Sequence, residues 1–236
     1  MKLRTRVFAQ LAALLLALGA SAFADNAYLY IVHGIPGRDL AENFNPGLPV
    51  DILVNGKSCL ARGLTFGNTA GPFTLAIGTY DVQISLANTL APCTNSPVID
   101  AQVPLSSGAS VSAVAAISGG QPALLQFDDN LAPVISGAAR FVFANSADAP
   151  ELQVTLTQLF GKHPKTFTVT ANPGAQSNAS VPPGTYLVQV VAVGSTTVLA
   201  SEQIFLADRS ANFVYAAGDA ANNSVSLINR IIRDVF

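Results

Sequence analysis

The sequence predicts an all-β protein in which a signal peptide precedes two tandem immunoglobulin-like β-sandwich domains. Three observations lead to this prediction. Most segments alternate apolar and polar residues with period two and are bounded by Gly, Pro, Asn or Ser. Only 11% of the 236 residues are charged while 50% are hydrophobic, which excludes an intrinsically disordered chain and a long coiled coil. The two halves of the chain also repeat one another.

The first 24 residues have the layout of a secretory signal peptide. Lys2, Arg4 and Arg6 form a positive start, residues 7–18 are apolar apart from one glutamine, and Ala22-Phe23-Ala24 is a small-residue cleavage site. The apolar run is shorter than the ~20 residues of a membrane-spanning helix. We therefore expect cleavage after Ala24 and export to the periplasm or the cell exterior, with no transmembrane segment in the mature protein.

Both halves beyond the signal peptide consist of short predicted strands, and no helix is expected. In the first half these strands are Tyr28–His33, Val50–Val54, Thr79–Leu86, Ser110–Ile117 and Leu124–Phe127. In the second half they are Arg140–Ala144, Leu152–Leu156, Thr166–Thr170, Thr185–Val193, Ser201–Leu206 and Asn212–Ala217.

The repetition involves three segments that occur in the same order in each half. Residues 73–84 match residues 179–190, residues 103–116 match 204–217, and residues 30–32 match 141–143. We expect a first sandwich over residues 25–130, a linker over residues 131–138 and a second sandwich over residues 139–236. The linker is too short for a flexible tether, so the sandwiches should touch.

A Gly-Thr-Tyr triplet occurs at the same place in each repeat, at residues 78–80 and 184–186. Glycine permits a turn conformation that other residues avoid, and the following residues start a strand. We expect Tyr80 and Tyr186 to cover one end of a sandwich core, in preference to binding a ligand.

Cys59 and Cys93 are the two cysteines of the chain, and an even number in an exported protein predicts a disulfide. The dipeptide Asn55-Gly56 is typical of a two-residue hairpin turn, which would place Cys59 opposite Ile52. Directly opposed residues share a face of a sheet, so Cys59 should point into the core with the row Val50, Ile52 and Val54. The bond would hold the loop that contains Cys93.

No metal site, cofactor or catalytic residue is predicted. His33 and His163 lie in different halves, and the motifs of serine hydrolases, zinc proteases and phosphate-binding loops are absent from the sequence. We expect His33 to be a hydrogen-bonded strand-end residue, Asp128-Asp129-Asn130 a polar turn, and Arg230 with Arg233 solvated charges. The net charge of −2 becomes more negative once the basic leader is lost, which argues against nucleic acid as a partner.

Two segments resemble the opening of the bacterial family called domain of unknown function 4397. Tyr30–Pro36 (Y-I-V-H-G-I-P) and Val50–Gly56 (V-D-I-L-V-N-G) are similar to the family's R-V-V-H-A-S-P-D-A-P and V-D-V-Y-V-N-G. In the second half Phe143–Pro150 is similar to the first of these, but Ala144 stands where the family has His and the Asn-Gly turn is missing. The resemblance implies an exported β-sandwich protein of the cell envelope or exterior, in two tandem copies, and it supplies no catalytic residues.

Relative to the second copy, the first copy has an insertion within residues 34–49. A sandwich core does not need this loop, and long loops on rigid scaffolds often carry binding sites. The alternative is an insertion without function, because longer loops cost little stability. The candidate recognition residues are Arg38, Asp39, Glu42, Asn43 and Phe44.

The sequence therefore predicts an exported, non-catalytic binding or structural module whose partner is an envelope protein or a glycan. One alternative is a secreted enzyme that acts on an extracellular polymer through two distant carboxylates. A second is an outer-membrane β-barrel. The barrel is disfavoured because residues 28–32 are apolar on both faces of their strand, whereas a barrel strand has a polar inner face.

Overall fold

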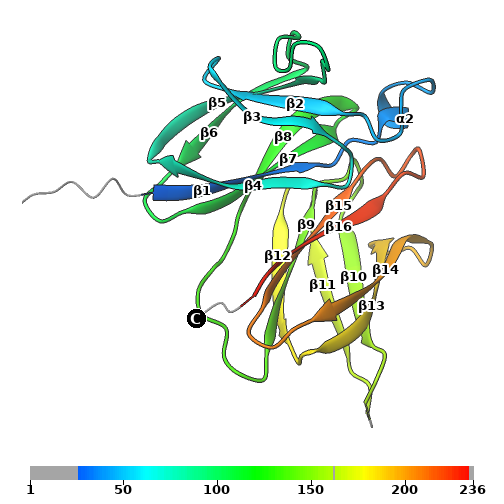
Figure 1. Cartoon of the computed structure of the whole chain (residues 1–236). Coiled ribbons are helices and arrows are strands. Elements are labelled where there is room, and N and C mark those ends of the chain that lie inside the picture. The colour runs from blue at the N-terminus through cyan, green and yellow to red at the C-terminus, as the bar shows by residue number, and fades with distance from the viewer. Residues whose placement is uncertain (1–25, 162, 234–236) are drawn as a thin grey trace, which may run out of the picture.

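A computed structural model describes residues 26–161 and 163–233, and Figure 1 shows its course. The predicted signal peptide and its cleavage site lie outside these residues. Within the described ranges the chain forms sixteen strands and one short helix. The predicted all-β class is confirmed.

The first half forms two sheets of four strands each, with the orders β4-β1-β7-β8 and β3-β2-β5-β6. Strands β1 and β7 pair in parallel, and the other pairings are antiparallel. The strands are β1 (Asn26–His33), β2 (Val50–Val54), β3 (Ser58–Leu64), β4 (Thr69–Ala76), β5 (Gly78–Leu86), β6 (Ile99–Leu105), β7 (Ser110–Ser118) and β8 (Gln121–Asp128).

The second half has the same topology, strand for strand. Its sheets have the orders β12-β9-β15-β16 and β11-β10-β13-β14, and β9 pairs in parallel with β15. The strands are β9 (Ala139–Asn145), β10 (Leu152–Gln158), β11 (Thr166–Ala171), β12 (Gln176–Val181), β13 (Gly184–Ala192), β14 (Val198–Leu206), β15 (Ala211–Ala217) and β16 (Ser226–Ile232).

Each half buries an apolar core between its two sheets. The first core contains Leu29 of β1 and the predicted inward row of β2, and the second contains Phe141 of β9 and Leu152 of β10. Burying one such side chain is worth roughly 1.5–3 kcal/mol. The two predicted sandwiches are therefore confirmed.

The Gly-Thr-Tyr triplets have equivalent contacts in the two sandwiches. The hydroxyl of Tyr80 donates to the carbonyl oxygen of Ala76 (2.9 Å), and that of Tyr186 donates to the carbonyl oxygen of Pro182 (2.8 Å). Both rings pack against their own core. The prediction that these tyrosines serve packing is confirmed.

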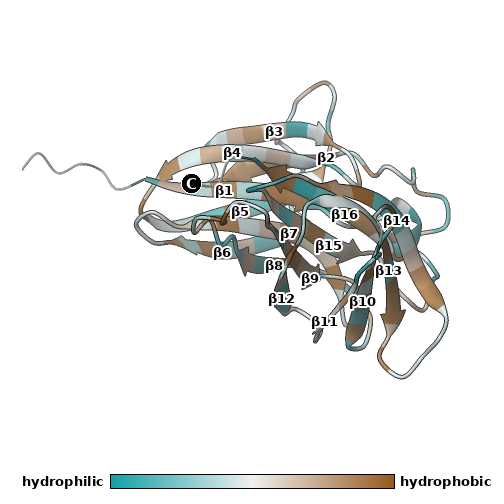
Figure 2. Cartoon of the chain, turned by 90° about the horizontal axis from the view of Figure 1, so that it is seen from below, coloured by the Kyte–Doolittle hydropathy of each residue, from teal (hydrophilic) through white to brown (hydrophobic). Residues whose placement is uncertain are grey.

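A third apolar cluster, which we call the seam, joins the two sandwiches. It includes Val32, Val114 and Phe127 of the first sandwich and Phe213 and Tyr215 of the second. Strands β7 and β15 are consequently buried along both faces, because one face lines a core and the other lines the seam. Figure 2 shows hydrophobic segments where β7, β9 and β15 meet. The two copies touch, as predicted.

Five strands were not predicted, and all of them are edge strands of their sheets: β3, β4, β6, β12 and β16. An edge strand tolerates glycine and proline, as at Gly71-Pro72 in β4, because one side of its backbone needs no ladder partner. The expectation of no helix was also wrong. The single turn α2 (Gly37–Leu40) lies inside the 34–49 insertion and is too short for hydrophobic periodicity to reveal it.

The predicted register of the β2–β3 hairpin was wrong. Val54 pairs with Ser58, so three residues form the turn, and Cys59 lies opposite Leu53 instead of Ile52. A shift of one residue moves every side chain of a strand to the other face of the sheet. Cys59 is therefore half-buried on the outer face and lies outside the core.

Candidate functional site

The 34–49 insertion is held in one shape by hydrogen bonds at its base. The buried imidazole of His33 donates from Nε2 to the carbonyl oxygen of Leu48 (2.7 Å), and its Nδ1 accepts the N–H of Ile35 (3.3 Å). The N–H of Phe66 donates to the carbonyl oxygen of Gly47 (2.7 Å). His33 is thus the hydrogen-bonded strand-end residue that was expected. Burial lowers its pKa, and the bond to Leu48 partly offsets this effect.

The predicted disulfide between Cys59 and Cys93 is present, with the two Cα atoms 5.9 Å apart. It fixes the loop of residues 87–98, which connects β5 to β6. Although the register prediction placed Cys59 in the core, the bond forms on the outer face of the sheet. The loop is therefore pinned to the outside of β3.

Asp51 is a second anchor of the 87–98 loop, and sequence reasoning missed it. Its buried carboxylate accepts the backbone N–H groups of Cys93 (2.8 Å), Asn88 (3.1 Å) and Gly63 (2.9 Å). Burial alone raises the pKa of this carboxyl, but the three N–H donors outweigh that effect and hold the pKa below its usual value. The sequence did contain a signal for this anchor, because a carboxylate lies within the apolar strand V-D-I-L-V. A carboxylate in such a strand is buried only when it has a partner, so Asp51 was a candidate for a structural bond.

Within this anchored loop, Leu90 is held away from the protein. The side-chain oxygen of Asn88 accepts the N–H groups of Leu90 (3.1 Å) and Ala91 (3.0 Å), and Asn95 donates to the carbonyl oxygen of Leu86 (2.9 Å). The side chain of Leu90 is 97% exposed. A large apolar side chain is thus presented to solvent by a fixed backbone.

A concave site of about 290 Å³ lies where the two loops meet, and we call it the loop hollow. The loops touch at its base, where the N–H of Ala87 donates to the carbonyl oxygen of Pro49 (2.9 Å). Apolar side chains predominate in its lining, which consists of Phe44, Asn45, Leu48, Pro49, Leu86, Ala87 and Thr89. Leu90 follows directly in the chain. The exposed leucine is thus next in sequence to Thr89, a lining residue of the hollow.

The five candidate recognition residues lie in different surroundings. Phe44 is 38% exposed and lines the loop hollow. Arg38, Glu42 and Asn43 are exposed. Asp39 instead accepts a hydrogen bond from the hydroxyl of Ser224 in the second sandwich (2.5 Å), so its carboxylate joins the two sandwiches. The structure therefore brings Phe44 together with the 87–98 loop and separates Asp39 from it.

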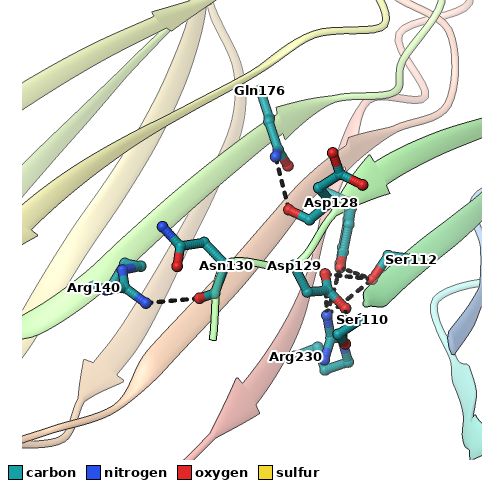
Figure 3. Close-up of polar contacts among 9 residues, drawn as sticks. Ser110, Ser112, Asp128, Asp129, Asn130, Arg140, Gln176 and Arg230 are labelled. Atoms are coloured by element: carbon teal, nitrogen blue, oxygen red, sulfur yellow. Dashed lines mark hydrogen bonds and ion pairs between the residues drawn. The ribbon is translucent and has the colours of Figure 1, made fainter. Parts of the chain in front are cut away.

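A buried polar cluster crosses the seam, as Figure 3 shows. The carboxylate of Asp129 pairs with Nη2 of Arg230 (2.6 Å) and accepts the hydroxyls of Ser110 (3.0 Å) and Ser112 (2.8 Å). The hydroxyl of Tyr215 donates to Ser112 (2.7 Å), and burial raises the pKa of Tyr215 to about 12. The prediction that Asp129 belongs to a simple polar turn is therefore wrong, because its carboxylate is buried in this cluster.

Arg230 was also predicted wrongly, because its side chain is only 8% exposed. Its guanidinium lies between two rings, 3.9 Å from the ring centre of Tyr30 in the first sandwich and 4.4 Å from that of Phe213 in the second. Burial raises the pKa of Asp129, and the positive charge of Arg230 opposes this rise. The pair holds the two sandwiches in one orientation.

Arg140 and Asp208 of the second sandwich bind the linker and the end of the first sandwich. Nη1 of Arg140 donates to the carbonyl oxygens of Asn130 (2.7 Å) and Ala132 (2.8 Å), and the N–H of Gly137 donates to the carboxylate of Asp208 (2.7 Å). Across the seam, Gln176 donates to the carbonyl oxygen of Asp128 (2.8 Å), a contact also drawn in Figure 3. The two sandwiches are therefore fixed relative to one another.

Over residues 26–161 and 163–233, no three His, Cys, Asp or Glu side chains gather where they could hold a metal ion. No helix in this part of the chain is both long and apolar enough to cross a membrane.

The family model described as domain of unknown function (DUF4397) matches residues 27–155. This range is more than half of the chain. The chain belongs to the DUF4397 family. The match contains both segments that carried the resemblance, together with His33, Asp51, the disulfide and the loop hollow. The DUF4397 region therefore covers the first sandwich and continues into β10 of the second.

Among solved structures, the chain is similar to the TIE protein of Bacillus anthracis, with 12% identity and a TM-score of 0.26. The similarity covers 80% of this chain and 33% of the TIE protein, so the chain spans about a third of it. A Bacteroides ovatus protein provisionally described as a cell adhesion protein has 8% identity and a TM-score of 0.29, with 88% of this chain and 98% of that one covered. A similarly described Bacteroides uniformis protein has 9% identity and a TM-score of 0.27, with 89% and 99% covered. Similarity at this level says nothing of function. No curated protein sequence matches the chain.

Proposed function

We propose that this protein is an exported, non-catalytic binding module that holds a partner protein at the loop hollow. The observation that carries the proposal is an apolar hollow whose lining residue Thr89 is followed in the chain by a leucine that is 97% exposed. Contiguous exposed apolar surface on a soluble domain is typical of an interaction site. Phe44 and Leu90 would supply the central apolar contacts, while Arg38, Glu42 and Asn43 would supply polar contacts around them.

The rigidity of the two loops supports binding at this place. His33 fixes the first loop, and the second is fixed by Asp51 and by the disulfide. A partner therefore does not have to order these loops, and ordering flexible segments is a main cost of association. A mainly apolar lining suits an apolar side chain of a protein better than a glycan, whose hydroxyl groups need polar partners when they lose water.

The predicted leader and the disulfide support export, because disulfides persist in oxidising compartments. The separate apolar cores support two units with the boundaries given above, residues 25–130 and 139–236. Their fixed orientation would present the loop hollow at one end of a rigid body.

The test is affinity capture from an envelope extract of the source organism, with the mature, disulfide-bonded protein as bait. The double variant Phe44→Ala/Leu90→Ser removes the apolar contacts of the site. A matched control, Phe160→Ala/Ile135→Ser, removes two exposed apolar side chains elsewhere (68% and 77% exposed). We expect a protein that the wild type and the control capture equally and that the site variant captures at least tenfold less. Equal capture by all three baits would refute the proposal.

A further inference from the structure

The imidazole of His33 connects the two ends of the 34–49 loop. One ring nitrogen donates to Leu48 near the end of the loop, and the other accepts from Ile35 at its beginning. A ring that donates through one nitrogen and accepts through the other must be neutral, with its proton on Nε2. The loop hollow, whose lining includes Leu48, therefore depends on an uncharged histidine.

The surroundings of the ring are uncharged and closed to water. The side chain is 1% exposed, and the ring of Phe66 meets it edge-on with the ring centres 6.4 Å apart. The backbone of His33 pairs with Gly67 and Asn68 on one side and lies next to Ala115 of β7 on the other. Neither β7 nor residues 65–68 contain a charged residue.

The charged groups on the other neighbouring elements are bound elsewhere or exposed. Arg38 and Glu42 of the insertion are exposed, and Asp39 accepts from Ser224. Across the seam, Asp148 accepts the backbone N–H groups of residues 119 and 120, and Asp219 accepts the backbone N–H of residue 221 and the side-chain amide of Asn222. None of them pairs with the ring of His33 in the described structure, so a positive charge there would be uncompensated.

Protonation would therefore break the present arrangement in two ways. Nδ1 would carry a hydrogen directed at the N–H of Ile35, so an acceptor would become a second donor. A positive charge would also be buried without a partner, which is strongly unfavourable. Opening the 34–49 loop would relieve both effects by giving the ring access to water.

We propose that acid loosens the 34–49 loop by protonating His33, and that the loop hollow is thereby a pH-regulated site. Its significance for binding rests on the proposed function, whereas the loosening of the loop does not. Histidine changes charge in the range that an exported protein meets in its medium. Because burial lowers the pKa of His33, the closed loop is fully stable above about pH 6.5 and loses stability as the pH falls toward the pKa of the folded state.

The first measurement is an NMR titration of the two imidazoles in the mature wild type. His163, which is exposed, is the internal reference, and the variant His163→Gln assigns the two signals. We expect the midpoint of His33 to lie below pH 6.5. A midpoint at or above that value would overturn the proposal without any variant of His33.

The second measurement is amide hydrogen exchange between pH 7.5 and pH 5, expressed as protection factors so that the intrinsic pH dependence of exchange is removed. Uptake of one proton on opening predicts that protection of residues 35–48 falls up to tenfold per pH unit below about pH 6.5. Protection of β7 should stay constant. Constant protection of residues 35–48 across this range would overturn the proposal.

The variant His33→Gln separates titration from structure, because glutamine offers a donor and an acceptor but does not titrate. Protection of its loop should be independent of pH, while His163→Gln should behave as the wild type. A pH dependence retained in His33→Gln would assign the effect to another group and overturn the proposal. These measurements follow the loop itself, so their failure is distinguishable from a failure to capture a partner.

Discussion

Replacing Asp129 by asparagine tests whether the seam depends on its buried ion pair. The change removes the negative charge 2.6 Å from Arg230 but keeps the size of the side chain. Arg230 is 8% exposed and has no other carboxylate within ion-pair distance in the described structure, so its charge would stay buried without compensation. Removing one partner of a buried pair costs about 3–5 kcal/mol, and we expect about 3 kcal/mol because the amide oxygen still accepts from Ser110 or Ser112.

The assay is equilibrium unfolding in urea, with Asp128→Asn as the matched control. Asp128 is the exposed neighbour of Asp129, and its replacement should change the free energy of unfolding by less than about 0.5 kcal/mol. For a chain of this size, 3 kcal/mol corresponds to a fall of roughly 6–12 °C in the melting temperature.

A double variant, Asp129→Leu/Arg230→Met, completes the test. Buried pairs replaced by apolar residues of similar volume are often neutral or stabilising, so this variant should be more stable than Asp129→Asn. A loss of less than about 1 kcal/mol in Asp129→Asn, or a double variant less stable than Asp129→Asn, would contradict a stabilising role of the ion pair.

Two further predictions concern the 87–98 loop. The double variant Cys59→Ser/Cys93→Ser should lose about 2–4 kcal/mol of unfolding free energy in urea, because the bond spans 34 residues of the chain; a loss below about 1 kcal/mol would contradict this. Since the pKa of Asp51 is below its usual value, its contribution to stability is present above about pH 4 and is lost as the pH falls through the folded-state pKa. Asp51→Asn should therefore flatten the decline in unfolding free energy between pH 5 and pH 2.5, whereas an unchanged slope would show that the N–H donors do not stabilise the charged form.

All the central strands could be predicted from the sequence, whereas among the edge strands only β8, β11 and β14 could. Residues 50–54 were predicted with their observed bounds because a strand with neighbours on both sides needs a strong apolar pattern. The edge strand β4 contains Gly71-Pro72, which reads as a turn in isolation. Its strand structure depends on pairing with β1, and residues 34–68 separate the two strands in the sequence. Such non-local pairing leaves little local signal.

The candidate site was predictable only in part, because it is formed by two loops from different places in the chain. The unequal length of the two repeats pointed to the 34–49 insertion and so to Phe44. Nothing local to residues 87–90 indicates that they meet Phe44, since this depends on the anchors Asp51 and Cys93. Likewise, Asp129 and Arg230 are 101 residues apart in sequence and look like surface charges until the two sandwiches are placed together.

The seam has a consequence for how the chain is made. Synthesis proceeds from the N-terminus, so the strands β1–β8 are complete before β9 exists. Until the second half arrives, Val32, Val114 and Phe127 form an uncovered apolar face, and Asp129 lacks its cation. A fragment truncated after residue 130 should therefore be prone to aggregate, although it retains a core of its own. Each half therefore covers apolar surface that the other would leave open to water.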